Sequence, residues 1–178
     1  MEYISSDTNV WIDFRAISRL ELPFRLPYTY IMSNDAIEDE LLTPGFQDAL
    51  VAYGLVGVDI TEDEFFLAEA YGHSFPKLST YDRIALAIAK LRNIVLLTGD
   101  MALRKAAKKE NVSLIGTIGI LDQLYEGRYI GRDEYSYCLT ELKRQNGSVV
   151  RLPGDELQGR IDKLKNEEQT MRQENPPA

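Results

Sequence analysis

Four acidic residues stand where a parallel α/β protein would gather its chemistry. Asp7 directly follows one short strand pattern, and Asp100 follows another. Asp82 opens a helical pattern eighteen residues before Asp100, and Glu40 lies near the last turn of a different one. In a parallel sheet, ligands bind outside the carboxyl ends of the strands. Because a helix starting at Asp82 can run back antiparallel to its strand, all four carboxylates can face one cleft.

Carboxylates at close range repel one another, and a hard divalent cation removes that conflict. Mg²⁺ and Mn²⁺ prefer oxygen ligands and keep several waters. A retained water can act as a nucleophile, while the metal stabilises charge on a phosphodiester. The four acids therefore predict a Mg²⁺ or Mn²⁺ site with hydrolytic chemistry.

Each acid also has a purely structural interpretation. Asp7 and Asp100 are suited to cap the helices that follow them, and Asp82 can pair with Ser79 in a capping box. Glu40 can be a solvated helix residue, and the two acids just before it are near-equal candidates for the site.

The composition limits the other chemistry that this chain can carry. Its 178 residues are 44% hydrophobic and 27% charged, which suits one domain with or without an appendage. Cys138 is the single cysteine, so an intrachain disulfide and a cysteine zinc cluster are excluded, and a Ser-His-Asp system would rest on His73 alone. No apolar run approaches the ~18 to 20 residues of a membrane span, and the first residues lack signal-peptide features. We expect a soluble, cytoplasmic protein with no membrane partner.

The negative charge is concentrated in the first part of the chain. The net charge is −8, with −9 in residues 1–100 and +1 in residues 101–178. This balance argues against a non-specific nucleic-acid coat, because such binding needs excess positive charge. It leaves open an enzyme that reaches phosphates through a bound cation.

Short apolar runs alternate with amphipathic segments up to about residue 127. Strands are predicted at 2–6, 28–32, 56–60, 94–97 and 112–115. A first helix carries Val10, Phe14, Ile17 and Leu20 on one face, and further helices are predicted at 34–42, 46–54, 62–71, 80–92, 101–110 and 119–126. This alternation predicts an α/β fold with a mainly parallel sheet covered on both faces.

The pattern changes after that point to two helices, near 132–145 and 154–172, with Asn146-Gly147 as a turn between them. We expect a domain over residues 1–127 and a helical C-terminal extension over 128–178, with about the last ten residues frayed.

Five short sequence segments follow one another along the chain and carry a resemblance to a known family. They are Ile4-Ser5-Ser6-Asp7-Thr8-Asn9, Ile37-Glu38-Asp39-Glu40-Leu41-Leu42, Leu78-Ser79-Thr80-Tyr81-Asp82, Leu96-Leu97-Thr98-Gly99-Asp100 with Leu103-Arg104, and Gly116-Thr117-Ile118-Gly119-Ile120-Leu121. Together they resemble the PIN-domain nucleases over residues 3–127, most closely the VapC-type toxins and their stand-alone bacterial relatives.

The resemblance implies a three-layer α/β/α sandwich and a metal-dependent ribonuclease. Asp7, Glu40, Asp82 and Asp100 would be its catalytic and metal-binding acids. Glu40 is preferred to its acidic neighbours because it is the acid of the family's Glu-Leu pattern.

The same resemblance assigns supporting roles to three polar residues. Thr8 and Asn9 match the polar neighbours of the central aspartate, and Thr98 would orient the loop that carries Asp100. About fifty residues follow the last matching segment, whereas compact toxins of this type stop sooner. Those residues can complete the fold, form a dimer contact or occupy a partner groove.

RNA would have to be held by local basic residues, because the chain as a whole is acidic. Arg104, Lys105 and Lys108 share one side of a predicted helix, and Arg83 adjoins Asp82. All four are candidates for contacts with RNA phosphates. Equally, they can form a solvated helix face with favourable charges near a C-terminus.

Two classes of function remain at this point. The first is a Mg²⁺- or Mn²⁺-dependent endoribonuclease, the toxin of a toxin–antitoxin pair with an antitoxin protein as partner, acting as a homodimer. The alternative is a PIN-like module that acts by dimerisation or protein binding, with little nuclease activity. Haloacid-dehalogenase-like phosphatases fit poorly, since Asp7-Thr8-Asn9 lacks their second Asp, and receiver domains fit poorly, since Ser6-Asp7 stands in place of an acidic pair.

Overall fold

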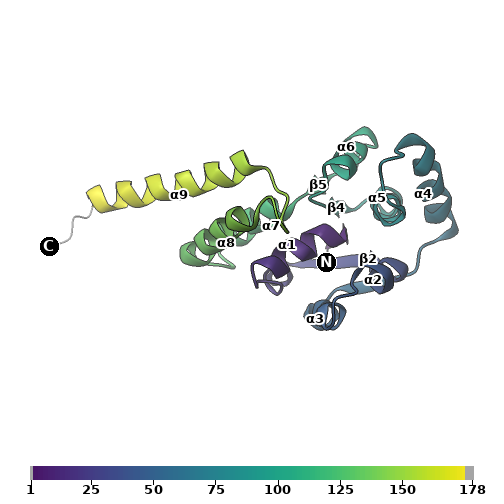
Figure 1. Ribbon diagram of the computed structural model, residues 1–178, viewed down its shortest axis with the longest axis horizontal. Coiled ribbons are helices and arrows are strands. Elements are labelled where there is room, and N and C mark those ends of the chain that lie inside the picture. The colour runs from purple at the N-terminus through teal and green to yellow at the C-terminus, as the bar shows by residue number, and fades with distance from the viewer. Residues whose placement is uncertain (1, 175–178) are drawn as a thin grey trace.

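Five parallel strands form one sheet in the computed structural model, which describes residues 2–174, with the backbone alone for 171–174 (Figure 1). The strands are β1 (Glu2–Ser6), β2 (Tyr28–Ser33), β3 (Val56–Val58), β4 (Val95–Leu97) and β5 (Leu114–Ile115). The helices are α1 (Thr8–Ala16), the short 3₁₀ turn η1 (Leu22–Arg25), α2 (Asn34–Glu40), α3 (Phe46–Tyr53), α4 (Glu62–Ser74), α5 (Thr80–Arg92), α6 (Met101–Lys109), α7 (Thr117–Glu126), α8 (Arg132–Gln145) and α9 (Gly154–Glu174).

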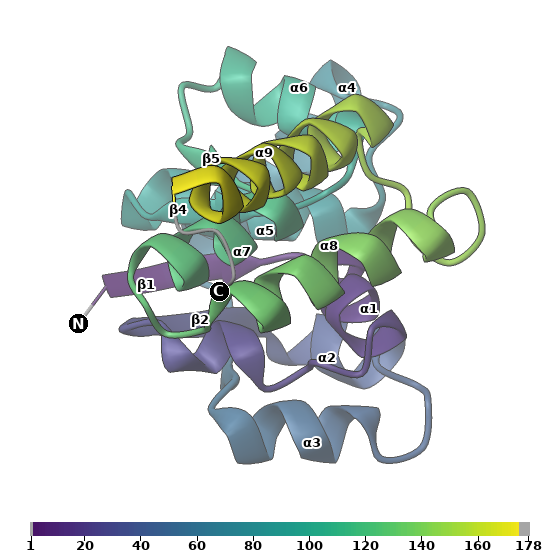
Figure 2. The same cartoon turned by 90° about the vertical axis from the view of Figure 1, so that its left-hand side faces the viewer.

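Each face of the sheet has its own hydrophobic core, because successive strand residues point to opposite sides. Ile4, Tyr30 and Leu97 pack with α1, α7 and α8 on one side. Ile31 and Leu96 pack with α4, α5 and α6 on the other. Figure 2 shows α7 and α8 on the viewer's side of the sheet and α5 beyond it. The three-layer α/β/α sandwich predicted from the sequence is confirmed.

The strand order β3-β2-β1-β4-β5 places β1 and β4 side by side at the centre. The chain moves outward through β2 and β3, then crosses to β4 and β5, so its direction of travel reverses between β1 and β4. Ser6 pairs with Leu97, and the Asp7 amide donates a 2.9 Å hydrogen bond to the Leu97 carbonyl. Both strands therefore end at the same level, at the point where open α/β sheets form their binding crevice.

The C-terminal helices pack onto this sandwich without a break in the apolar core. Tyr135 of α8 stacks on Tyr125 of α7 with 4.4 Å between ring centroids. Arg160 of α9 forms a 2.7 Å ion pair with Asp122 of α7. Figure 1 shows α9 beside α8, extending away from the sheet. The domain boundary after residue 127 falls in the α7–α8 connection and stays a prediction.

Several predicted element boundaries are wrong in instructive ways. The first helix ends at Ala16, because Ser18 adopts a left-handed φ of 55°, so Leu20 lies outside the helix. Helix α7 begins at Thr117, two residues earlier than predicted, with Gly116 as its cap residue. Helix α9 spans Gly154–Glu174, two residues longer than predicted. The fraying of about the last ten residues stays a prediction, and residues 175–178 of that segment lie outside the described residues.

The connection between α8 and α9 is longer than the two-residue turn predicted at Asn146-Gly147. Residues 146–153 form a loop with a bridge between Asn146 and Val150. Within residues 2–174, no helix is long and apolar enough to cross a membrane.

Candidate active site

Asp7 is a buried carboxylate at the carboxyl end of β1, with 7% of its surface exposed. It occupies the cap position of α1, but its side chain does not cap that helix. Its Oδ2 atom instead accepts hydrogen bonds from Asn9 Nδ2 at 3.1 Å and from the Thr98 hydroxyl at 2.9 Å. The capping interpretation therefore fails for Asp7. Its carboxylate instead contacts Thr98, the residue that follows β4.

The surroundings of Asp7 disfavour its negative charge. Burial, and after it the charges of Asp82 and Glu40, raise its pKa from 3.8 to about 7, although the hydrogen bonds from Thr98 and Asn9 oppose the rise. Among the described side chains, no Lys or Arg forms an ion pair with Asp7, Glu40 or Asp82. A buried acid that faces two further acids and no cation is the arrangement found at functional sites rather than in structural ion pairs.

Glu40, the last residue of α2, lies beside Asp7. It accepts a hydrogen bond from the Thr8 hydroxyl, and burial followed by the Asp82 charge raises its pKa. Glu40 and Asp7 line a small cavity of about 10 Å³, together with Ser33 and Tyr81. This volume holds roughly one water-sized particle.

The neighbouring acids of α2 are placed differently. Glu38 is exposed, and Asp39 accepts a hydrogen bond from the Tyr81 hydroxyl. Of the three consecutive acids at the end of this helix, Glu40 is the one that lines the cavity.

Asp82 and Asp100 combine a capping contact with a position beside the site. Asp82 Oδ2 accepts from the Ser79 amide at 2.8 Å, and the Ser79 hydroxyl accepts from the Asp82 amide, which completes the capping box. Asp100 Oδ1 accepts from the Leu103 amide at 2.7 Å. Burial raises the pKa of Asp82, and Asp100 is among the charges that contribute. Each carboxylate thus uses one oxygen as a helix cap and keeps a second oxygen for other partners.

Thr98 connects the two central strand ends. Its hydroxyl donates to Asp7 Oδ2 and accepts from the Asp100 amide at 3.0 Å. The side chain is completely buried, so this arrangement is fixed by the core. Thr98 therefore positions the Asp100 loop relative to Asp7.

The described side chains do not form a complete metal-binding group. No three Asp, Glu, His or Cys side chains among them are arranged to hold one ion. The oxygen donors of Asp7 and Glu40 and the small cavity between them nevertheless fit Mg²⁺ or Mn²⁺, which is often bound through one or two carboxylates and keeps several waters.

Comparison with known proteins assigns the fold to a family. A family model described as a PIN domain matches residues 3–166. The chain belongs to the PIN-domain family. The match includes β1 through α8 and most of α9. No curated protein and no solved structure matches the chain. The PIN domain is a nuclease fold, and nucleases of this fold typically use divalent metals and act on nucleic acid.

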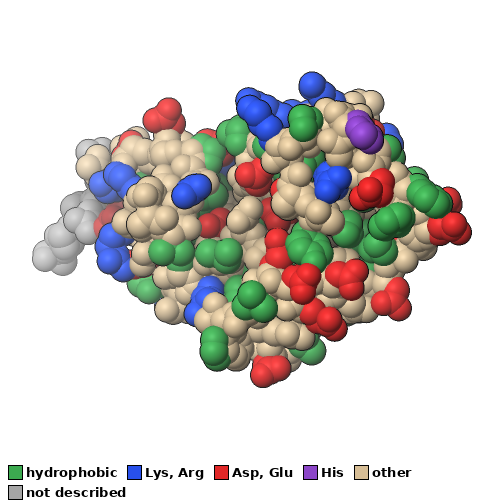
Figure 3. All heavy atoms as spheres, turned by 45° about the vertical axis from the view of Figure 1, so that its right-hand side comes forward, with side chains coloured by type: hydrophobic (Ala, Val, Ile, Leu, Met, Phe, Trp, Pro, Cys, Tyr) green, Lys and Arg blue, Asp and Glu red, His purple; other side chains and the backbone are tan. Residues whose placement is uncertain are grey.

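The four basic residues predicted to contact phosphate fall into two groups in this PIN domain. Arg83 donates to the Ser79 carbonyl and the Thr80 hydroxyl, and Arg104 donates to the Thr98 carbonyl at 3.3 Å. The other two, Lys105 and Lys108, are exposed on α6. Figure 3 shows acidic side chains across the middle of one face and a group of basic side chains along its upper edge.

Sequence reasoning missed Asp13, a second buried acid of the PIN domain. It is 5% exposed, and it accepts a 2.6 Å hydrogen bond from the Thr117 hydroxyl. Burial raises its pKa to about 6. The available signal was an acid inside the apolar face of the first helix, between Val10 and Phe14.

Proposed function

We propose that this PIN domain is a Mg²⁺- or Mn²⁺-dependent endoribonuclease that hydrolyses RNA phosphodiester bonds. The observation that carries the proposal is the environment of Asp7. Its buried carboxylate receives only neutral hydrogen-bond donors and faces the charges of Glu40 and Asp82. A divalent cation would supply the positive charge that no described side chain supplies.

Asp7 and Glu40 would hold the metal directly, with Asp82 and Asp100 contributing through their remaining oxygens or through water. When bound, such a metal stabilises charge on the phosphodiester and provides a nucleophilic water. The neutral donors Thr98 and Asn9 orient the Asp7 carboxylate without cancelling its charge. Thr8 does the same for Glu40.

Phosphate contacts on either side of the scissile bond would come from basic residues near the acidic cluster, which is the set Asp7, Glu40, Asp82 and Asp100. Lys105 and Lys108 are exposed and suited to this role, while Arg83 and Arg104 would have to exchange or share their present carbonyl and hydroxyl partners.

The direct test is cleavage of a mixed RNA pool in the presence of Mn²⁺, with the wild type and Asp7→Asn purified identically. We expect the wild type to cut the pool and the variant not to. Equal cleavage by both proteins would point to a contaminant and would refute the assignment of Asp7.

A matched pair of variants on α2 tests the placement of Glu40. Glu40→Gln removes a carboxylate that lines the cavity, whereas Glu38→Gln makes the same change at an exposed position of the same helix. We expect cleavage to fall in Glu40→Gln and to stay at the wild-type rate in Glu38→Gln. The reverse pattern would make Glu38 the site residue.

One observation favours the alternative function, a binding module without nuclease activity. The described acids do not form a three-ligand metal group in their present positions. Titration calorimetry with Mn²⁺ separates the two functions. Absence of both Mn²⁺ binding and cleavage would leave a protein-binding role, and the α8–α9 region would be the first surface to examine.

We further propose that the protein is a cytoplasmic homodimer and the toxin of a toxin–antitoxin pair. The family resemblance supports this proposal. The neighbouring exposed side chains of Phe65 and Phe66 on α4 support the dimer alone, because adjacent exposed aromatic side chains are suited to a protein contact. Light scattering should give twice the mass of one chain, and Phe66→Ser should lower it if this surface is the contact.

A further inference from the structure

A cleft of about 900 Å³ opens beside the acidic cluster. Asn9 and Asp100 are among its lining residues, so the cleft adjoins the candidate active site. The turn from β5 into α7 lines another part of it, and the 146–153 loop between α8 and α9 forms one wall. The C-terminal region, whose role the sequence analysis left open, therefore supplies part of the lining of this cleft.

The 146–153 loop is held in a defined shape. Asn146 Nδ2 donates to the Leu152 carbonyl at 2.9 Å, and Asn146 Oδ1 accepts from the Leu152 amide at 2.9 Å. The Gly147 amide also donates to the Val150 carbonyl. This clasp fixes the residue between Val150 and Leu152, which is Arg151.

The loop lies directly on the turn that carries Asp100. A Cβ atom placed on Gly99 would be 3.8 Å from Leu152 Cδ2 and 3.8 Å from Asp13 Oδ2. Gly99 therefore lies close to Leu152 of this loop and to Asp13, a buried acid that also lines the cleft. The base of the wall is anchored by Arg160 of α9, which donates to both carboxylate oxygens of Asp122 at 2.9 Å.

The cations of the cleft differ in how they are used. Arg160 is neutralised by Asp122, so its role is to hold α9 in place. Arg104 lies against Gly116 and donates to the Thr98 carbonyl, but forms no ion pair among the described side chains. Arg151 is exposed, and it has neither an ion pair nor a side-chain hydrogen bond among the described side chains, which end at residue 170. Arg104 and Arg151 are thus available to bind anionic groups in the cleft.

We propose that this cleft holds the RNA segment next to the scissile phosphate, with Arg151 and Arg104 binding its phosphates and the loop 146–153 forming one wall. The proposal rests on the proposed ribonuclease function and adds the loop between α8 and α9 to the RNA-binding surface. A volume of about 900 Å³ accommodates roughly two or three nucleotides. Apolar side chains of the lining, such as Leu152 and Met101, offer surface against which bases can pack.

Binding can be measured without catalysis in the full chain carrying Asp7→Asn. The probe is a fluorescein-labelled 12-nucleotide RNA of mixed sequence, followed by fluorescence anisotropy in buffer with EDTA. We expect Arg151→Glu in this background to weaken binding at least tenfold and to reduce the slope of log affinity against log salt, because a phosphate contact is lost.

Lys165→Glu is the matched control, since it makes the same change of charge at an exposed position of α9 outside the cleft. We expect it to bind the probe within twofold of the parent. Equal weakening in both variants, or no binding by the parent, would overturn the proposal. Arg151→Gln, which removes the charge without reversing it, should give an intermediate loss, and thermal melts establish that each variant is folded.

The two proposals fail separately. Wild-type cleavage with unchanged binding in Arg151→Glu refutes the cleft assignment alone, whereas Arg151-dependent binding without any cleavage refutes the ribonuclease.

Discussion

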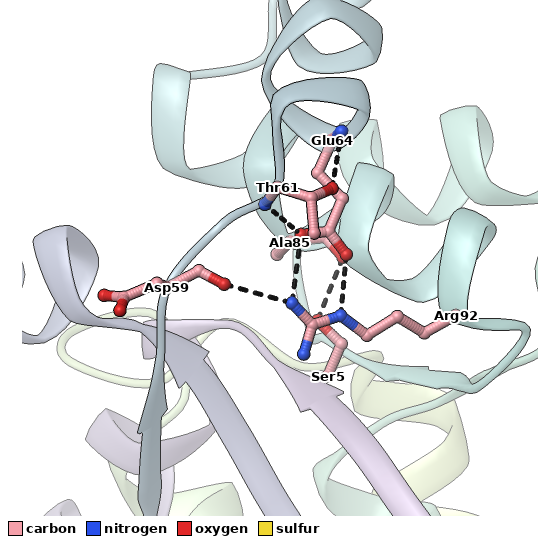
Figure 4. Close-up of polar contacts among 6 residues, drawn as sticks. All are labelled: Ser5, Asp59, Thr61, Glu64, Ala85 and Arg92. Atoms are coloured by element: carbon pink, nitrogen blue, oxygen red, sulfur yellow. Dashed lines mark hydrogen bonds and ion pairs between the residues drawn. The ribbon is translucent and has the colours of Figure 1, made fainter.

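Two buried acids, Asp7 at the carboxyl end of β1 and Glu64 on α4, have opposite kinds of surroundings in this fold. Glu64 of α4 is 2% exposed and accepts hydrogen bonds from Arg92 Nε at 2.6 Å and Nη2 at 3.0 Å, and from the Thr61 amide at 2.8 Å (Figure 4). Arg92 also donates to the Asp59 carbonyl. The hydrogen bond from Arg92 holds the pKa of Glu64 below its ordinary value. Asp7 is buried almost as deeply but has no cationic partner.

The difference separates a charge that the fold itself uses from one that, under the proposed function, would serve to bind a metal. Glu64 is satisfied by groups of the fold itself, so its charge contributes to stability. Asp7 is satisfied only by neutral donors and repelled by Glu40 and Asp82, so its charge costs stability in the metal-free protein. A fold retains such a charge where it has a use outside the fold.

The largest expected effect is on the rate of RNA cleavage, and only the substitution of Asp7 should cause it. Asp7→Asn should lower the rate of Mn²⁺-dependent RNA cleavage by about 10²- to 10³-fold or more, the loss typical of removing one electrostatic contact to a transition state. Glu64→Gln should leave the rate per folded molecule unchanged. Initial rates on a labelled RNA, at equal concentrations of folded protein, measure both. A similar loss in the two variants would erase the distinction between the acids.

The next largest effect is on the free energy of unfolding, which the substitutions of the two acids should change in opposite directions. Glu64→Gln should lower the free energy of unfolding by about 2 kcal/mol, because charged hydrogen bonds to Arg92 are weakened at a buried position. Asp7→Asn should leave it unchanged or raise it, because a penalised buried charge is removed. Urea denaturation in EDTA at pH 7 gives both values. Greater destabilisation by Asp7→Asn would show that its carboxylate is structural.

The pH dependence of stability should show the same contrast. The pKa of Asp7 is raised from 3.8 to about 7, so between these pH values the native state keeps a proton that the unfolded chain releases. Its contribution to unfolding free energy therefore falls as the pH rises from about 4 to 7, by at most about 1.4 kcal/mol per pH unit. The pKa of Glu64 is lowered, so its contribution is present above its ordinary pKa of 4.5 and is lost as the pH falls through the native value.

Urea denaturation in EDTA between pH 3 and 8 measures these slopes. Asp7→Asn should make the decline in unfolding free energy toward neutral pH shallower, and the remainder is expected from Asp13, Glu40 and Asp82, whose pKa values are also raised. Glu64→Gln should flatten the fall in unfolding free energy at acid pH. An unchanged decline in Asp7→Asn would show that Asp7 does not contribute to it.

The smallest effect is the stabilisation by metal. At a concentration about five times its dissociation constant, Mn²⁺ should raise the free energy of unfolding by about 1 kcal/mol, because it binds the folded cluster and not the unfolded chain. The rise should diminish in Asp7→Asn and Asp100→Asn and persist in Glu64→Gln. Thermal melts with and without Mn²⁺ measure it. An unchanged rise in both Asn variants would place the metal elsewhere.

The fold was largely predictable because each part of it is encoded locally. The helix predicted at 80–92 has those bounds in the structure, since Ser79 and Asp82 form the predicted capping box and the apolar face between them and Arg92 is continuous. The alternation of strands and helices, together with the polar residues that follow β1 and β4, was sufficient to indicate a parallel sheet and the edge at which acids collect.

The rest depends on contacts between distant segments. The sequence offered no means of knowing that Arg104 is tied to the Thr98 carbonyl, or that the 146–153 loop lies on Gly99. Asp13 was missed because its partner Thr117 is far away in the sequence. The catalytic roles of Asp7, Glu40, Asp82 and Asp100 stay predictions, which the variants above test.

The double use of Asp82 and Asp100 has an evolutionary consequence. Each carboxylate supports a helix start with one oxygen, and Asn caps a helix about as well as Asp does. Replacement of Asp100 by Asn therefore removes a negative charge from the cluster while leaving the start of α6 supported. If Asp100 contributes to metal binding as proposed, one such replacement would remove the chemistry and keep the shape, so a nuclease and a binding protein of this fold would differ by a single substitution.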